Sequence, residues 1–186
     1  QYETLQAAVD AVQGSGTIEL TSSIALSDQV TIDSGKTIIL DMNGETLSIG
    51  FSDSSKNLIV NNGTLTITGD GTFDATEATS YKGFINNYGT LTVENGTFQI
   101  ADKAMTVHLR NQDGGKAVIN GGTFSGGATI VRSFEGSNTT ITGGSFTNSV
   151  YPAVDVNGET LITGGIFTNT SCSRCDSQNW GYTVRS

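Results

Sequence analysis

Four side chains in the second half of the chain are the best suited to contact or transform a ligand. They are His108, Arg132, Asp155 and Arg185, and the first three follow one another at similar intervals (132 − 108 = 24 and 155 − 132 = 23). Each lies in a short apolar phrase. If the fold stacks one phrase on the next, the four side chains form one exposed strip, with Arg132 beside Asp155. Such a strip can hold an acidic or hydroxylated ligand by charge-assisted hydrogen bonds.

Three interpretations of this strip remain open. Arg132 and Asp155 can form a simple surface ion pair, or the strip can face a ligand and contact a sugar carboxylate, or it can be catalytic. Glycoside hydrolysis needs two carboxyl groups, whereas Asp155 is the only carboxylate among these phrases. His108 is the only histidine, and no nucleophile motif accompanies it. We therefore predict a non-catalytic binding strip and assign no catalytic residue.

The element that must position these side chains is a repeat in which an apolar strand is followed by a glycine or asparagine turn and a phenylalanine. Its phenylalanines lie 25, 26, 22 and 21 residues apart, at positions 73, 98, 124, 146 and 167. A period in this range is typical of solenoids, and it is too short for a propeller blade of roughly 40 residues. The runs between turns are short and rich in Thr, Val and Ile, which predicts strands. The copies are Leu65–Phe73, Leu91–Phe98, Ala117–Phe124, Thr139–Phe146 and Thr160–Phe167.

The repeat predicts an all-β fold, a right-handed single-stranded parallel β-helix. Alternate residues of a strand face the same side, so equivalent residues of successive coils form inward columns. One predicted column is aliphatic and the other is the phenylalanine series. Because the repeats differ in length, we expect loops of variable length at one corner, where binding usually occurs. The aliphatic column is Ile67, Val93, Ile119, Ile141 and Ile162.

The chain reads as one domain, residues 1–186, in three parts. Residues 1–13 form an amphipathic helix that covers the first coil, because Leu5, Ala8, Val9 and Val12 share one face. Residues 17–170 form the coils, and residues 171–186 close the last one.

The closing segment contains the only two cysteines, Cys172 and Cys175. Zinc needs about four ligands, and the chain offers one distant histidine besides this pair. A local disulfide is the favoured interpretation, given an extracellular protein. We expect no metal and no cofactor.

Composition limits the partners. The net charge of −9 and the pI of about 4.3 argue against nucleic acid and anionic membranes. No apolar run approaches the roughly 18 residues of a membrane span, so we expect no membrane insertion. No stretch has the features of a signal peptide, which fits either a cytoplasmic protein or a mature fragment.

The phrase Leu5–Val12, the segment Lys36–Leu47 and the Gly-Gly-x-Phe turns carry a family resemblance. The first resembles the start of pectate-lyase-like β-helix proteins. The other two are similar to repeat domains of large surface proteins from Gram-positive, gut-type bacteria. The Cys-Ser-Arg-Cys insertion departs from that pattern. The resemblance implies a secreted or cell-surface bacterial module, part of a larger protein.

We expect such a module to bind a glycan or a host or environmental protein without catalysis. Two alternatives remain, because fold alone does not define function. One is a polysaccharide lyase or glycoside hydrolase of the same fold, and the other is a structural stalk or spacer.

Overall fold

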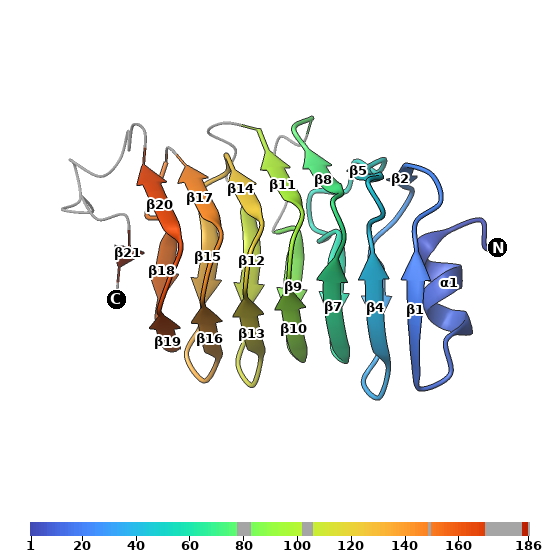
Figure 1. Ribbon diagram of the computed structural model, residues 1–186, viewed down its shortest axis with the longest axis horizontal. Helices are drawn as coiled ribbons and strands as arrows, with labels where there is room; N and C mark the ends of the chain where they lie inside the picture. Colours follow the sequence, from blue (N-terminus) through green and yellow to red (C-terminus); the bar gives the residue numbers. More distant parts are fainter. Residues whose placement is uncertain (78–82, 102–105, 149, 170–183, 186) are drawn as a thin grey trace.

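The structure, a computed structural model, is a parallel β-solenoid that begins with one short helix (Figure 1). It describes residues 1–77, 83–101, 106–148, 150–169 and 184–185. Three seven-stranded sheets run the length of the coils, and every strand pairing in them is parallel. The predicted fold class is therefore confirmed.

Each coil contributes one strand to each sheet, in the same order. Sheet A contains β1 (Ser15–Glu19), β4 (Thr37–Asp41), β7 (Thr64–Thr68), β10 (Thr90–Val93), β13 (Lys116–Ile119), β16 (Asn138–Ile141) and β19 (Glu159–Ile162). Sheet B contains β2 (Ile24–Leu26), β5 (Thr46–Ile49), β8 (Thr72–Ala75), β11 (Thr97–Ile100), β14 (Thr123–Ser125), β17 (Ser145–Asn148) and β20 (Ile166–Asn169). Sheet C contains β3 (Val30–Ile32), β6 (Ile59–Asn61), β9 (Ile85–Asn87), β12 (Val107–Asn111), β15 (Thr129–Ser133), β18 (Val154–Val156) and β21 (Val184–Arg185).

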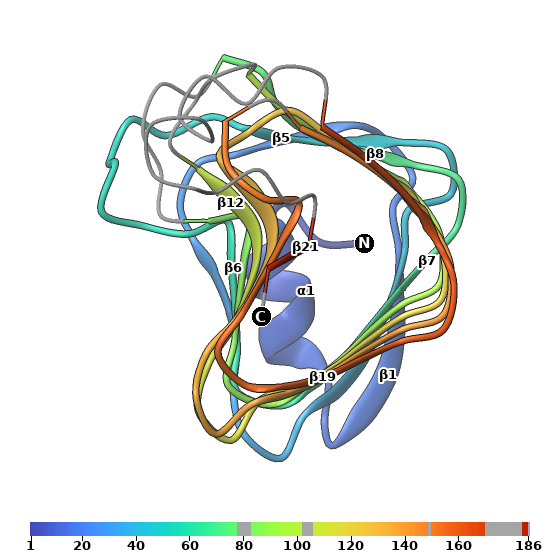
Figure 2. The ribbon, with the colours of Figure 1, turned by 90° about the vertical axis from the view of Figure 1, so that its left-hand side faces the viewer.

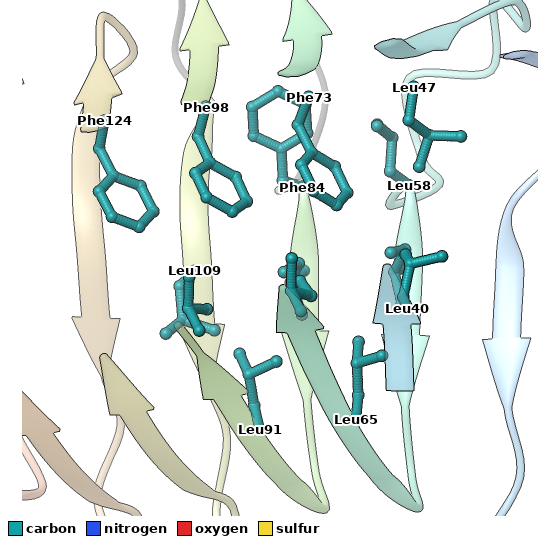
Figure 3. Close-up of a cluster of buried hydrophobic side chains, with 14 of the residues drawn as sticks. Leu40, Leu47, Leu58, Leu65, Phe73, Phe84, Leu91, Phe98, Leu109 and Phe124 are labelled. Atoms are coloured by element: carbon teal, nitrogen blue, oxygen red, sulfur yellow. The ribbon is translucent and has the colours of Figure 1, made fainter. Parts of the chain in front are cut away.

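Both predicted inward columns are present. The aliphatic column runs through sheet A in the register Ile67–Val93–Ile119–Ile141–Ile162. The phenylalanine column runs through sheet B, and each ring stacks on the next with centroids 4.5–5.0 Å apart. Figure 3 shows how leucines of sheet A and phenylalanines of sheet B meet inside the coils. Stacking at the spacing of parallel strands, about 4.8 Å, thus gives the solenoid a continuous apolar core.

The Gly-Gly turns between sheets A and B need both glycines, for different reasons. Gly122 has a φ of 98°, which disfavours residues with a side chain. Gly121 lies against the coil before it, where an added Cβ would be 2.5 Å from the carbonyl oxygen of Glu94. One glycine therefore sets the turn and the other lets neighbouring coils approach.

A ladder of buried asparagines lies inside the corner between sheets C and A. Asn61 donates to Asn87 at 2.7 Å, and Asn87 donates to Asn111 at 2.8 Å. Asn111 then donates to the hydroxyl of Thr139 at 2.9 Å. These side chains also donate to backbone carbonyls of the turns beside them. The ladder was not predicted, and it satisfies polar groups that would otherwise be costly to bury.

The helix α1 (Leu5–Ala11) is shorter than the predicted residues 1–13. Thr4 is its N-cap and accepts a hydrogen bond from the amide of Ala7 at 3.1 Å. At its other end, Nζ of Lys36 donates to three backbone carbonyls, of residues 9, 10 and 12. Leu5 and Val9 join the core, as predicted. The helix crosses the end of the coils on the side of sheet C, where it packs against β3 (Figure 2).

The connections of variable length all lie at the corner between sheets B and C. They comprise residues 27–29, 50–58, 76–84, 101–106, 126–128 and 149–153, while the turns at the other two corners stay short. Figure 2 shows the connection 50–58, between β5 and β6, projecting from this corner of the coil. The predicted variable corner therefore exists, and it borders the outer face of sheet C.

Candidate functional site

The outer face of sheet C carries a polar column that crosses successive coils. Its residues Asn86, Arg110, Arg132 and Asp155 occupy equivalent positions on β9, β12, β15 and β18. Neighbouring side chains in this column are held at the strand spacing, about 4.8 Å. Arg132 and Asp155 are adjacent, as predicted, whereas Arg110 occupies the position predicted for His108.

The two arginines share one aromatic neighbour. The guanidinium carbon of Arg110 lies 5.2 Å from the centroid of the Phe134 ring, and that of Arg132 lies 5.5 Å from it. Both distances are within the range of a cation–π contact. Burial lowers the pKa of Arg110, and the neighbouring positive charge of Arg132 lowers it further. An arginine nevertheless stays protonated, so the fold holds two positive charges side by side.

Asp155 adds one negative charge to this pair. Its Oδ2 lies 3.2 Å from Nε of Arg132. The carboxylate is only 10% exposed, whereas the side chain of Arg132 is 42% exposed. The carboxylate end of this ion pair is therefore shielded from water, whereas the side chain of Arg132 remains accessible to solvent.

A hollow of about 220 Å³ opens between these charged groups and the loops at the corner of sheets B and C. We call it the arginine pocket. It is smaller than the roughly 300–1,000 Å³ of pockets for drug-sized ligands, so its size suits one sugar ring or one functional group. Its described lining combines charged, hydroxyl and apolar side chains. These residues are Val107, Arg110, Ala128, Thr129, Arg132, Tyr151, Pro152 and Asp155.

His108 does not belong to this exposed strip, and its predicted position is wrong. It is 1% exposed and lies in the interior, where its ring is 5.5 Å from that of Phe84 and 5.9 Å from that of Phe124. Two successive inward residues recur at the start of the sheet C strand in five coils, as Leu58–Ile59, Phe84–Ile85, His108–Leu109, Ile130–Val131 and Ala153–Val154. Alternation is therefore interrupted near the start of β12, where Val107 and Leu109 pair with β15 but His108 does not.

The environment of His108 is apolar, so its chemistry differs from that of a surface histidine. Burial lowers its pKa from 6.5 to about 4, although backbone groups of Phe98, Ser125 and Thr129 oppose this shift. Its Nε2 lies 3.1 Å from the carbonyl oxygen of Ser125. Since a carbonyl only accepts, Nε2 carries the proton of the neutral ring. This residue lies in the interior and does not line the arginine pocket.

Two further predictions fall wholly or partly outside the described residues. The backbone of Arg185 pairs with that of Asp155, but the side chain of Arg185 lies outside the described part of the structure. Cys172 and Cys175 also lie outside it, so their disulfide stays a prediction. Within the described ranges, no group of three or more His, Cys, Asp or Glu side chains could hold a metal ion.

Sequence reasoning missed Arg110 and the loop residues of the pocket. The signal for Arg110 was present, because aligning Leu109 with Val131 places Arg110 against Arg132. The prediction places His108 beside Arg132 instead, because it assumes that β12 alternates from its first residue. No sequence pattern predicted that Tyr151 and Pro152 line the pocket, because their positions depend on the path of the loop between β17 and β18.

A larger hollow, of about 730 Å³, lies at the start of the solenoid between α1 and the first coil. It exists because α1 packs toward β3 and leaves the edges of β1 and β2 less covered. Its lining includes Leu5, Val12 and Ile18. We place the candidate site at the arginine pocket, because charged groups from neighbouring coils converge there.

Comparison with known proteins adds no further assignment. The chain matches no protein-family model, no curated protein and no solved structure. Among the described residues, no helix is long and apolar enough to cross a membrane. The geometry of the solenoid and of the arginine pocket is therefore the basis for assigning function.

Proposed function

We propose that this chain is a non-catalytic binding module that holds a ligand, foremost a glycan, in the arginine pocket. One observation carries the proposal. Arg110 and Arg132 lie on adjacent strands over one aromatic ring, beside a hollow at the corner where the loops vary. Loops held by a rigid scaffold are common places for binding.

The lining of the pocket favours a glycan over other ligands. Tyr151 and Pro152 offer apolar surface to a sugar ring, and a tyrosine combines such a surface with a polar tip. Thr129, Asp155 and the arginines offer partners to hydroxyl and acidic groups. A protein ligand remains an outcome of the test.

Two features support binding without turnover. Hydrolysis of a glycosidic bond uses a pair of carboxyl groups, and Asp155 is the one carboxylate among the described residues that line the pocket. His108 is buried in the core, away from a ligand in the pocket. A lyase or hydrolase of this fold is the alternative that an assay must address.

We also propose that the chain is a pectate-lyase-like repeat of a Gram-positive bacterial surface protein, secreted or held at the cell surface. Support comes from the phrase Leu5–Val12 and from the Gly-Gly-x-Phe turns. In that setting the solenoid would carry its binding corner away from the cell wall.

The test is a binding screen of the purified chain on a glycan array and a panel of extracellular host proteins. Arg110→Ala/Arg132→Ala should abolish binding of the glycans that the native chain retains. The matched control is Lys56→Ala/Lys116→Ala, which removes two positive charges that do not line the pocket and should leave binding unchanged. Product release from acidic polysaccharides, assayed in parallel, would refute the non-catalytic assignment. Neither binding nor product release in any of these assays would instead favour a structural stalk.

A further inference from the structure

The first coil ends two of the three sheets in strand edges that pair with no other described strand. β1 and β2 are the end strands of sheets A and B, whereas α1 packs against β3 at the end of sheet C (Figure 1). Exposed strand edges attract further strands, and proteins commonly protect them with lysine, proline or a bulge. β1 is five residues long, Ser15–Glu19, and contains neither lysine nor proline. Its outer edge is therefore suited to pairing with another strand.

The backbone groups of β1 that face this edge follow from the ladder. The N–H of Leu20 donates to the carbonyl of Asp41 at 2.9 Å, so the backbone of Leu20 faces β4. In a regular parallel ladder, the backbone groups of successive residues point to opposite sides of the strand. Thr17 and Glu19 therefore present their N–H and C=O groups to the outer edge. A partner strand can bond to these groups without disturbing the pairing of β1 with β4.

The apolar core is also open at this end of the solenoid. The inward columns of sheets A and B begin with Ile18 and Ile24, which are only partly buried. Their neighbours in the next coil, Leu40 and Leu47, are almost completely buried. Both isoleucines line the hollow of about 730 Å³ beside α1. Apolar side chains of an added strand would enter this hollow and remove the isoleucines from water, which favours binding.

The charges around the hollow indicate the chemistry of the partner. Glu3 and Glu19 are the charged side chains among its described lining residues. Asp41 is in register with Glu19 on the adjacent strand, so a further carboxylate adjoins this edge. A second copy of this chain that paired β1 with β1 about a two-fold axis would bring the same carboxylates together. Like charges that face each other destabilise a strand pair, so a basic partner is favoured.

We propose that this end of the solenoid binds an extended segment of a partner protein in which apolar residues alternate with lysine or arginine. The segment adds a strand to the outer edge of β1. Its apolar side chains fill the hollow beside Ile18 and Ile24, and its basic side chains lie on the same face as Glu19. This site goes beyond the proposed function, because the hollow and the arginine pocket share no lining residue.

The probe for this site is a capped, fluorescein-labelled peptide of alternating lysine and valine, whose dissociation constant is measured by fluorescence anisotropy. The same peptide with glutamate in place of lysine should bind at least about tenfold more weakly. Glu3→Gln/Glu19→Gln should weaken binding of the lysine peptide about three- to tenfold. The matched control Glu94→Gln/Glu159→Gln removes two carboxylates that do not line the hollow and should leave binding unchanged.

Thr17→Pro tests the strand edge directly. Proline removes the N–H that faces the partner, and it is tolerated on an edge strand where that N–H is not used in the ladder. The variant should fold and lose peptide binding. If it does not fold, N-methylated peptides give the same test with the native chain. Methylation of all valine amides blocks one edge of the peptide and methylation of all lysine amides blocks the other, so one of the two peptides should lose binding and the other should retain it.

The remaining outcomes would overturn the proposal. Peptide binding that survives in folded Thr17→Pro, or that survives both methylations, refutes strand addition. Equal binding of the lysine and glutamate peptides, or binding of neither, refutes the basic partner. Self-association of the native chain in analytical ultracentrifugation, if Thr17→Pro abolishes it, would assign the edge to a second copy instead. Glycan binding in the arginine pocket is measured independently, so the two proposals can fail separately.

Discussion

Protonation of the buried His108 should destabilise the fold over a defined pH range. Its pKa is about 4 in the folded chain, against an ordinary value of 6.5. Above pH 6.5 the ring is neutral in both states and contributes no pH dependence. As the pH falls from 6.5 toward 4, the unfolded chain takes up a proton that the folded chain does not, so the free energy of unfolding decreases. Below about pH 4, His108 causes no further decrease in the free energy of unfolding.

The size of the effect follows from the shift of 2.5 pKa units (6.5 − 4). At 1.36 kcal/mol per unit, the complete loss is about 3 kcal/mol. About 2 kcal/mol of it should appear between roughly pH 7.5 and pH 5. His108→Leu removes the titrating group and keeps an apolar side chain among Phe84 and Phe124. His108 is the only histidine, so no other imidazole contributes in this range.

The assay is urea unfolding followed by circular dichroism at several pH values, for the native chain and for His108→Leu. The difference between the two free energies should grow by about 2 kcal/mol on acidification to about pH 5. Carboxylates titrate in both proteins, so their contribution cancels in that difference. Parallel stability curves would refute the reasoning, because they would mean that His108 is accessible to protons in the folded chain.

Three substitutions test other parts of the scaffold. Asn87→Ala should lower the free energy of unfolding, measured in urea, by about 2–4 kcal/mol, because it interrupts the buried asparagine ladder. The control Asn86→Ala, at the adjacent outward position, should lower it by less than about 1 kcal/mol, and equal losses would contradict a stabilising role of the ladder. Phe98→Ala should lower the free energy of unfolding by about 3–5 kcal/mol, because it opens a cavity in the middle of the ring stack. A loss below about 1 kcal/mol would show that the stack contributes little to stability. Lys36→Met should lower amide-exchange protection of α1 by about tenfold, as three carbonyls lose their donor, and unchanged protection in α1 would contradict this.

The repeat made the architecture predictable. Strand alternation, the phenylalanine period and the Gly-Gly turns act within one coil or between equivalent positions of neighbouring coils. Phe98 stacks on Phe73 and Phe124 because each occupies the same place in its own copy. The pairing of Arg132 with Asp155 was predictable for the same reason.

The asparagine ladder is a repeat that can be seen in the sequence but whose burial could not be predicted from it. Asn61, Asn87 and Asn111 recur at the end of successive sheet C strands. Asparagine at a strand end is typical of an exposed turn, so the sequence gives no reason to place it inside. Only the corner geometry, which turns these side chains inward next to the carbonyls of the adjacent turn, makes burial favourable.

The solenoid, its inward columns and the contact of Arg132 with Asp155 could be predicted from the amino-acid sequence, because these features depend on periodicity. The remaining features of the candidate site depend on how the chain folds in three dimensions. The tertiary structure buried His108, brought Arg110 beside Arg132 and placed Tyr151 and Pro152 in the lining of the arginine pocket. Periodicity fixes which face a side chain takes only while the strand alternates regularly, and the first residues of β12 do not. At the corners and along the loops, the path of the backbone decides which side chains meet, and that path depends on contacts between coils.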